Sequence, residues 1–323
     1  MSSPSQAPTL PARVPQQCAD AVLMVRPRAF GFNAETALTN TFQQADAADA
    51  AALQSRALAE FQTLARALSG EGIGVCVAED CAEPPKPDAV FPNNWVSFHA
   101  CGTLVLYPLA AASRRPERRQ AVIDAAIQSS GFRLTHLLDL TWHESEQRFL
   151  EGTGSLVLDH VNRIAYACAS PRTDPQLVRE WARELKFEPV IFHAADRAGV
   201  PLYHTNVCLW IGSQVAVVAA EAIAAADREA VLASLAGTGR EVIRIGHTEL
   251  AGFAGNMLEL GTWDEALGDS RVLVMSESAR RVLQPQVFAQ LSGCVDTVLS
   301  VPVPTIERLG GGSVRCMLAE VFR

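Results

Sequence analysis

The expected elements of this chain follow one order five times: an amphipathic helix, a strand, a short polar segment and two further strands. A unit of this kind cannot bury its own apolar face, so several units must pack against one another. The repeat lies in the order of the elements and not in the letters of the sequence. The five polar segments, called polar turns below, are Phe91–Trp95, Glu151–Ser155, His204–Asn206, Gly255–Asn256 and Gly312–Cys316.

Residues that favour the beginning or the end of a helix mark the bounds of the expected helices. Between Asp46 and Leu68, five apolar residues recur every three or four positions and share one face, and Gly70 then ends the pattern: Leu53, Ala57, Phe61, Leu64 and Leu68. Asp174-Pro175 is an N-cap residue followed by proline at the first helical position. The expected helices are Asp46–Leu68, Pro116–Ser130, Asp174–Lys186, a segment from Asp227 to before Gly237, and one from Ser276 or Ser278 to before Gly293, which Pro285 interrupts. The expected strands are Ala21–Val25, Ile73–Val77, Thr103–Tyr107, Arg133–Leu138, Arg163–Cys168, Pro189–His193, Gln214–Val218, Glu241–Ile245, Arg271–Met275 and Val295–Val301.

Five such units in a closed ring would leave few free sheet edges and would bring the polar turns together at the axis. The fifth unit runs out at Arg323, and the N-terminal strand Ala21–Val25 could supply its missing piece. The alternative is a doubly wound α/β sheet. No GxGxxG follows a strand and no GxxxxGK[ST] occurs, which disfavours a nucleotide-binding sheet. We therefore expect a single α/β domain over residues 21–323, preceded by a disordered or loosely packed segment, residues 1–20.

Composition excludes several classes of protein. The formal net charge of −8 disfavours nucleic-acid binding, because phosphate backbones are repelled. Apolar runs such as Val215–Ala220 are much shorter than the roughly 20 residues that a membrane span needs. The polar start, Met1–Gln17, lacks the pattern of a secretory signal, so we expect a cytoplasmic protein with reduced cysteines. Cys76 and Cys81 have no second pair at zinc spacing, and we expect no metal site.

Three polar-turn residues could form a catalytic set. Cys316 follows three glycines, which allow close approach of a ligand, and its thiol could be ionised by a nearby imidazolium. His204 and Glu151 occupy equivalent places in other repeats. A nucleophilic thiol, an imidazole acid/base and an orienting carboxylate suit acyl or amidino transfer. Each residue taken alone is more often structural: a buried cysteine, a satisfied core histidine, a surface carboxylate.

The polar turns also contain several asparagines, namely Asn93, Asn94, Asn206 and Asn256. Each side-chain amide can donate and accept hydrogen bonds, which suits a neutral, amide-like ligand. The same residues could instead cap turns.

These motifs resemble those of the guanidine-modifying, or pentein, superfamily, which contains arginine deiminases, dimethylarginine dimethylaminohydrolases and amidinotransferases. The resemblance runs from about Val22 to Phe322 and is greatest to the amidinotransferase-like branch with the bacterial citrulline utilisation hydrolases. It implies a five-bladed pseudo-symmetric α/β propeller, with Cys316 as the nucleophile, His204 as the acid/base and Glu151 as its partner. The motifs that carry it are Met24–Pro27, Asp88–Trp95, Leu150–Ser155, His204–Val207, Gly255–Leu258 and Gly311–Met317.

The chain departs from the arginine-processing members at positions where they commonly place Asp. The first polar turn has Asn93-Asn94, and Asn206 follows His204 where the deiminase pattern is His-Leu-Asp. A buried guanidinium without counter-charges is costly, whereas amides satisfy a neutral ureido group. We therefore expect a citrulline-like substrate, bound by Asn93, Asn94 and Asn206. This expectation weakens if other carboxylates reach the site, the candidates being Asp88, Glu259 and Glu320.

The expected reaction is hydrolysis of a ureido or guanidino C–N bond of an arginine- or citrulline-like substrate through a covalent intermediate on Cys316. It requires no metal or organic cofactor. Two alternatives remain: an amidinotransferase, which would use the same residues, and a non-catalytic binding protein of the same fold. Arg26, Arg148 and Arg315 are candidates for binding the substrate carboxylate, although a surface salt bridge is the favoured role for any one of them. The protein could be a homo-oligomer.

Overall fold

The computed structural model describes residues 16–264 and 268–323. Its strands are β1 (Ala21–Arg26), β2 (Gly74–Glu79), β3 (Val96–Phe98), β4 (Thr103–Leu106), β5 (His136–Asp139), β6 (Leu156–Asp159), β7 (Ile164–Cys168), β8 (Glu188–Phe192), β9 (Leu209–Ile211), β10 (Val215–Val218), β11 (Glu241–Arg244), β12 (Leu258–Asp264), β13 (Gly268–Ser276), β14 (Thr297–Val301) and β15 (Ala319–Val321). The α-helices are α1 (Ala34–Ala37), α2 (Ala50–Gly70), α3 (Gln120–Ser130), α4 (Gly152–Ser155), α5 (Pro175–Leu185), α6 (Ala225–Gly237), α7 (His247–Ala251), α8 (Glu277–Val282), α9 (Pro285–Gly293) and α10 (Pro304–Gly310).

One pairing pattern recurs in the described strands. In β3–β4–β5, β6–β7–β8, β9–β10–β11 and β12–β13–β14, the first two strands are antiparallel and the third is parallel to the second. The set β15–β1–β2 has the same pattern and joins both ends of the chain. Because β15 also pairs with β3, two sets merge into a six-stranded sheet, and the other three sheets stay separate. The expected role of the N-terminal strand is confirmed.

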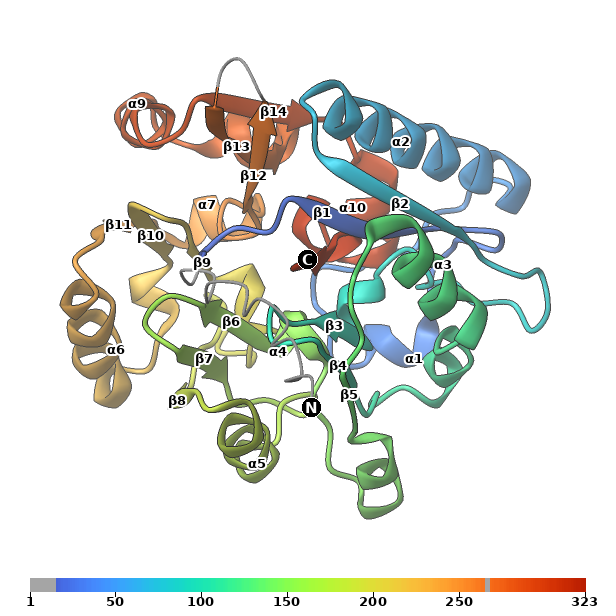
Figure 1. The fold of residues 1–323 in the computed structure, drawn as a ribbon, viewed down its shortest axis with the longest axis horizontal. Coiled ribbons are helices and arrows are strands. Elements are labelled where there is room, and N and C mark those ends of the chain that lie inside the picture. The colour runs from blue at the N-terminus through green and yellow to red at the C-terminus, as the bar shows by residue number, and fades with distance from the viewer. Residues whose placement is uncertain (1–15, 265–267) are drawn as a thin grey trace, which may run out of the picture.

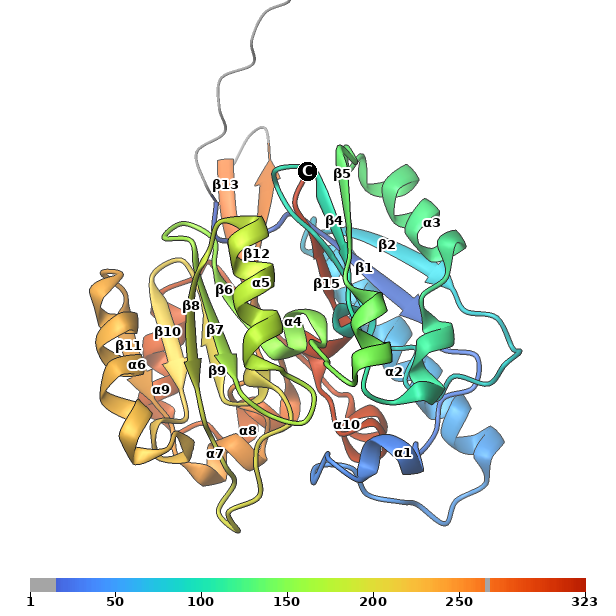
Figure 2. The same ribbon diagram turned by 90° about the horizontal axis from the view of Figure 1, so that it is seen from below.

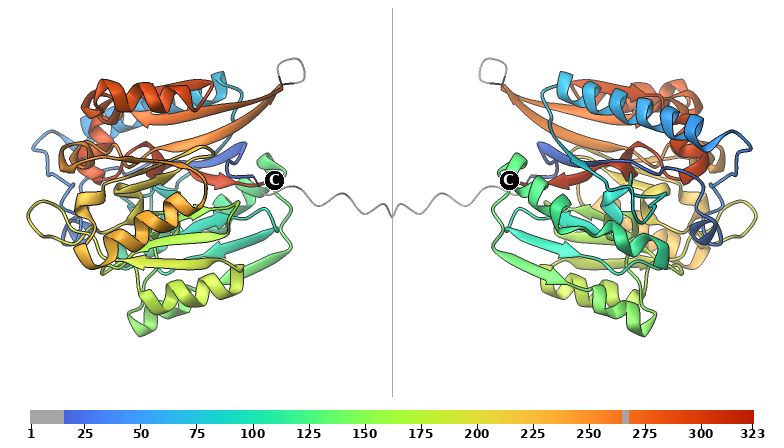
Figure 3. Two further views of the ribbon diagram at one scale, coloured as in Figure 1. Left: turned by 90° about the vertical axis from the view of Figure 1, so that its left-hand side faces the viewer. Right: turned by 90° about the vertical axis from the view of Figure 1, so that its right-hand side faces the viewer.

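The longer helices lie around the outside of the sheets (Figure 1). Seen from below, β1 and β15 run side by side close to the short helix α4 (Figure 2). In the side views, the blue helix α2 runs along the outer side of the orange sheet β12–β13–β14 (Figure 3). The sheets therefore occupy the interior, and their connecting turns meet there.

Helix α2 shows why its sequence folds as expected. The five predicted apolar positions are all buried: Leu53, Ala57, Phe61, Leu64 and Leu68. They pack with residues of β12, β13 and β14 in one apolar core. The helix begins at Ala50 and not at Asp46, because Asp49 is the N-cap and accepts hydrogen bonds from the Ala51 and Ala52 amides.

Other helix boundaries agree in part with the sequence. Asp174 caps α5 by accepting from the Leu177 amide at 2.7 Å, and Pro285 separates α8 from α9, both as expected. The fourth helix begins before Asp227, whose carboxylate binds His193 instead. The expected start of the second helix at Pro116 is also wrong, because that residue lies in a separate 3-10 turn, η2 (Ala112–Glu117).

Four polar turns form single helical turns: η1 (Pro92–Asn94), α4, η4 (Thr205–Val207) and η6 (Val314–Met317). The fourth turn, Gly255–Asn256, follows α7 without a helical turn of its own. Sequence analysis did not predict α10, which ends at the three glycines preceding Cys316. The remaining 3-10 turns are η3 (Thr141–Glu146) and η5 (Ala220–Ala222).

The start of the chain was expected to be loose over residues 1–20, and residues 1–15 of that segment lie outside the described residues. Its end is packed, contrary to expectation. Gln17 is buried, and its Nε2 donates to the carbonyls of Leu158 (2.9 Å) and Ile211 (3.2 Å). Among the described residues, no helix has the length and hydropathy required to cross a bilayer.

Candidate active site

The polar turns enclose a small buried cavity. Its lining includes Cys316, His204 and Asn94, which come from three different turns. Its volume is about 20 Å³, room for one or two water molecules, so an amino-acid-sized ligand must displace part of the lining. The other lining residues are Thr36, Asn40, Asp88, Phe91, Arg114, Arg172, Tyr203, Gly310, Gly311 and Gly312.

A larger surface pocket lies elsewhere, next to the segment that carries Asn40. It measures about 760 Å³ and is lined by Thr41, Phe42 and Gln44 together with α7 and α10 residues. None of the predicted catalytic or binding residues lines it. The small cavity, which Cys316, His204 and Asn94 line, is therefore the candidate active site.

His204 is held by Glu151. The two residues come from different polar turns, and His204 Nε2 lies 2.8 Å from Glu151 Oε2. Because a carboxylate accepts, we assign the proton to Nε2, which leaves Nδ1 without it in the neutral ring. Gly154 leaves space for this arrangement: a Cβ there would lie 2.7 Å from His204 Nδ1 and 2.6 Å from Asn94 Nδ2.

Glu151 is a fully buried carboxylate with several donors around it. Its Oε1 accepts from the Ala110 amide at 3.1 Å, and its Oε2 lies 3.4 Å from Arg172 Nη1 and 4.0 Å from Arg114 Nη1. Burial alone raises the pKa of Glu151, but Arg172, His204 and Arg114 outweigh that effect and hold the pKa far below its usual range. Glu151 is therefore ionised at neutral pH.

The other two members of the set rest uncharged. Burial lowers the pKa of His204 to about 4, against the opposing effect of Glu151. Burial raises the pKa of the Cys316 thiol, although Asn256, the Ser313 backbone and other nearby groups oppose it. At neutral pH the site thus contains a thiol, a neutral imidazole and a carboxylate.

Cys316 lies in η6 and is only 4% exposed. Its Sγ contacts two side-chain amides, Asn256 Nδ2 at 3.3 Å and Asn206 Nδ2 at 3.6 Å. The described contacts include no hydrogen bond between His204 and Cys316, although both line the cavity. Gly311 is needed nearby because its φ is +62° and a Cβ there would lie 2.5 Å from Asn40 Nδ2.

The three expected substrate-binding asparagines differ in position. Asn94 lines the cavity, and its Oδ1 accepts from Arg114 Nη1 at 2.7 Å. Asn206 contacts the sulfur, and its buried Oδ1 has no partner among the described residues. Asn93 is not in the lining; its Oδ1 accepts from Asn94 Nδ2 at 3.1 Å.

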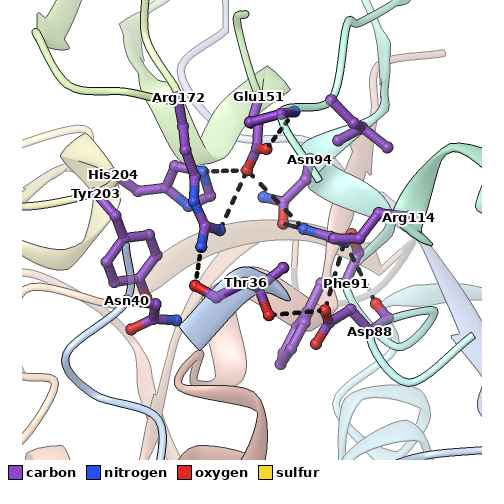
Figure 4. A network of polar contacts seen from close by, with 12 residues as sticks. Thr36, Asn40, Asp88, Phe91, Asn94, Arg114, Glu151, Arg172, Tyr203 and His204 are labelled. Atoms are coloured by element: carbon purple, nitrogen blue, oxygen red, sulfur yellow. Dashed lines mark hydrogen bonds and ion pairs between the residues drawn. The ribbon is translucent and has the colours of Figure 1, made fainter. Parts of the chain in front are cut away.

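Sequence analysis missed two cavity arginines and treated the nearby acid only as a competing possibility. Arg172 Nη2 donates to the Thr36 carbonyl at 2.6 Å, and its guanidinium lies 5.1 Å from the Tyr203 ring (Figure 4). Arg114 pairs with Glu117 at 2.9 Å. No local pattern distinguishes these arginines from the other arginines of the chain, because their positions depend on tertiary contacts.

Asp88 lies at the end of the polar network that is opposite to Glu151 (Figure 4). Its Oδ2 accepts from Asn33 (2.7 Å) and Thr36 (3.2 Å), whereas Oδ1 is buried without a partner in the described part of the chain. Its presence in the Asp88–Trp95 motif was a usable signal. Of the three carboxylates that could weaken a neutral site, Asp88 lines the cavity, whereas Glu259 and Glu320 do not.

The arginines proposed from the sequence to bind a carboxylate are elsewhere. Arg26 pairs with Glu79 at 2.8 Å, and Arg148 pairs with Asp174, the N-cap of α5, and with Glu180 within that helix. Arg315 donates to Leu318 O and pairs with Glu320. None of the three lines the cavity, and each forms ion pairs, the role that the sequence favoured for them; the arginines in the cavity lining are Arg114 and Arg172.

The described residues contain no group of three or more His, Cys, Asp or Glu side chains placed to hold a metal ion. The polar side chains that line the cavity carry amides, guanidinium groups, hydroxyl groups, one carboxylate, one imidazole and one thiol, which can recognise an organic ligand by hydrogen bonding.

Comparison with solved structures shows the fold. The apo structure of ArgZ, an arginine dihydrolase from the ornithine-ammonia cycle in cyanobacteria, has a TM-score of 0.71 at 17% identity and matches 93% of this chain but 40% of its own. This chain thus spans about two fifths of that protein. An N-terminal domain of ArgZ bound to substrate has a TM-score of 0.69 at 17% identity, with 94% of this chain and 99% of that chain covered.

A dimethylarginine dimethylaminohydrolase adduct with S-methyl-L-thiocitrulline has a TM-score of 0.61 at 15% identity and covers 94% of this chain and 99% of its own. No curated protein matches the sequence. The family described as N,N dimethylarginine dimethylhydrolase, eukaryotic, matches residues 26–323. The chain therefore belongs to the N,N dimethylarginine dimethylhydrolase family, within the guanidine-modifying pentein superfamily.

Proposed function

We propose that this protein hydrolyses a ureido or guanidino C–N bond of an amino-acid substrate through a covalent intermediate on Cys316. The observation that carries the proposal is that Cys316 and the imidazole of His204, which Glu151 holds, line one buried cavity. The Cys316 sulfur attacks the central carbon of the substrate. His204 protonates the departing amine and then accepts a proton from the water that releases the enzyme.

Glu151 orients the imidazole and stabilises the imidazolium that forms during the reaction. Because His204 is neutral at rest, its catalytic proton must come from the thiol or the substrate within the closed site. If the thiol is the source, Cys316 ionisation and His204 protonation occur together once the substrate is bound.

The charged lining supports a substrate with an amino-acid end. Arg172 and Arg114 can bind a carboxylate, and the free Oδ1 of Asp88 can accept from an ammonium group. A cavity lined by both guanidinium groups and a carboxylate matches the zwitterionic end of an amino acid.

The reacting end of the substrate is favoured to be neutral. The side chains that contact the Cys316 sulfur are the amides of Asn206 and Asn256, and the cavity lining contains two further amides, Asn40 and Asn94. Uncharged amides such as Asn206 and Asn94 match a ureido group, so citrulline is the favoured substrate. An arginine-like substrate is the second candidate, because Asp88 brings a carboxylate with a free oxygen into the same cavity.

The architecture we propose for this enzyme is a single domain, residues 21–323, folded as a five-bladed pseudo-symmetric propeller. The five strand sets with one pairing pattern support this arrangement, and so does the completion of one set by β1 and β15. In such a ring the polar turns would converge on the axis, where the cavity lies.

The test is a substrate panel of citrulline, arginine, methylated arginines and agmatine, assayed for ammonia and for the amine product. We expect turnover of citrulline above that of the other compounds, and none in Cys316→Ser. Cys101→Ser, at an exposed cysteine, is the matched control and should retain full activity. Activity that persists in Cys316→Ser would overturn the mechanism.

Two further outcomes separate the alternatives. Transfer of an amidino group from arginine to glycine, seen by product analysis, would identify an amidinotransferase instead. A fully inert panel together with binding of one of the compounds would identify a non-catalytic binding protein.

A further inference from the structure

The Asn256 side chain has a fixed orientation beside the sulfur of Cys316. Its Oδ1 accepts from the Arg315 backbone amide at 3.1 Å, and its Nδ2 donates to the Asn206 carbonyl at 2.9 Å. Exchanging the oxygen and nitrogen atoms would place acceptor against acceptor and donor against donor at these contacts. The neighbours of Asn256 therefore force its NH₂ group toward Cys316 Sγ, 3.3 Å away.

The backbone supports this placement. A Cβ at Gly255 would collide with the carbonyl oxygen of Val207, so only glycine lets the fourth polar turn approach the third this closely. Asn256 itself is fully buried. The amide can thus move little relative to the sulfur.

A buried thiolate needs donors, and the side-chain donors described in contact with the Cys316 sulfur are the amides of Asn206 and Asn256. His204 donates a hydrogen bond from Nε2 to Glu151 and makes no described hydrogen bond to Cys316. The Asn206 amide also faces the sulfur, but at 3.6 Å and with an Oδ1 that no described partner fixes. Asn256 provides the shorter contact and the one with a defined direction.

We infer that Asn256 is a catalytic residue that stabilises the thiolate of Cys316 by donating a hydrogen bond from Nδ2 to Sγ. This assignment rests on the proposed function of Cys316 as a nucleophile. The same amide serves both states of the sulfur, because Oδ1 lies 3.7 Å from Sγ and can accept from the neutral thiol. On ionisation the S–H bond breaks, the electron pair stays on sulfur, and in the free enzyme the proton passes to solvent water.

Asn206 then has a different role from Asn256. Its free Oδ1 can accept from an N–H of the substrate, as proposed above, whereas both polar atoms of Asn256 are already used within the protein. Of the two amides that contact the sulfur, Asn206 would bind the substrate and Asn256 would stabilise the thiolate.

The test measures the ionisation midpoint of Cys316 without any substrate. The ultraviolet absorbance of the thiolate is recorded against pH, and the signal of the same protein carrying Cys316→Ser is subtracted, which removes the other cysteines. Asn256→Leu, which keeps the size of the side chain and removes the donor, should raise the midpoint by about one to two pH units, as expected for loss of one hydrogen bond to a charged group. Asn256→Ala should shift it in the same direction.

Asn206→Ala is the matched comparison, since it removes the other amide that contacts the sulfur. We expect a smaller shift, because its contact is longer and its orientation is free. An unchanged midpoint in the folded Asn256 variants would overturn the assignment, as would lower thermal stability without a shift, which indicates a structural role only. If neither Asn256 variant folds, an Asn206→Ala shift as large as one to two units would overturn it.

This measurement is independent of turnover. If the substrate panel is inert but the Asn256 variants shift the midpoint, the proposed reaction fails while the donor role stands. If citrulline is turned over but the midpoint does not shift, the donor role alone fails.

Discussion

Glu151 Oε2 accepts a hydrogen bond from His204 Nε2 at 2.8 Å, although 53 residues separate the two in the chain. The same oxygen lies 3.4 Å from Arg172, so one carboxylate orients the imidazole and anchors a cavity arginine. The His204 imidazole and the Arg172 guanidinium are thus positioned by the same carboxylate.

Replacing Glu151 by Gln should reduce kcat by roughly 10² to 10⁴-fold, because the imidazole loses the anion that orients it and stabilises its cation. Steady-state kinetics with the best substrate of the panel measure the loss. Glu117→Gln is the matched control: Glu117 is also buried and paired with Arg114, but it does not contact His204. An equal loss of kcat in both variants would contradict a role specific to the imidazole.

Gly154→Ala should impair catalysis without unfolding the protein. The added Cβ meets the ends of the Asn94 and His204 side chains, which can shift at the expense of their alignment. We expect kcat to fall by roughly 100-fold, the effect of a displacement near one ångström. Gly237→Ala, where the Cβ meets nothing within 4 Å, should be neutral. A fully active Gly154→Ala would show that the observed imidazole position is not the reactive one.

Asn206→Asp should change the choice of substrate. A carboxylate next to Cys316 attracts a cationic guanidinium and offers less to a neutral ureido group, so the ratio of kcat/KM for arginine to that for citrulline should rise by about tenfold or more. Both constants are measured on the same preparation. A ratio that stays constant would show that the amide at this position does not select the charge of the substrate.

Stability should fall in acid through buried neutral histidines, and His99 is the clearest case. Burial lowers the pKa of His99 to about 3, from an ordinary value of 6.5, so the unfolded chain binds a proton that the folded chain does not between these values. The contribution of His99 to stability is complete above pH 6.5 and is lost toward pH 3. Between pH 7 and 4.5 the loss is about 2 to 3 kcal/mol.

Urea denaturation across this pH range measures the effect. His99→Gln should show a shallower decline, whereas His136→Gln, at an exposed histidine, should follow the parent protein. Parallel curves for His99→Gln and the parent would contradict a buried neutral His99.

The parts of the fold that sequence analysis predicted well are those specified by local patterns. Helix α2 has both an apolar face and a nearby cap, and all five predicted apolar positions are buried. The start of α6 was wrong because Asp227 is used by His193, a residue that only the tertiary structure brings near.

The residues of the candidate site also fall into two groups, those that a local sequence pattern marks and those that it does not. Cys316, His204 and Glu151 stand out because glycines and polar residues interrupt apolar strands at these points. Arg114 and Arg172 carry no such local signal, since their places in the cavity follow from contacts with Asn94 and with the Thr36 backbone, far away in the chain. The three arginines chosen from the sequence form ion pairs outside the cavity.

The pairing of β15 with β1 makes the position of Cys316 depend on residues far from it in the sequence. The strand that directly follows η6 is paired with β1, so β1 fixes one flank of the turn that carries the sulfur. A substitution that weakens β1 would therefore displace Cys316, although β1 lies in none of the polar turns.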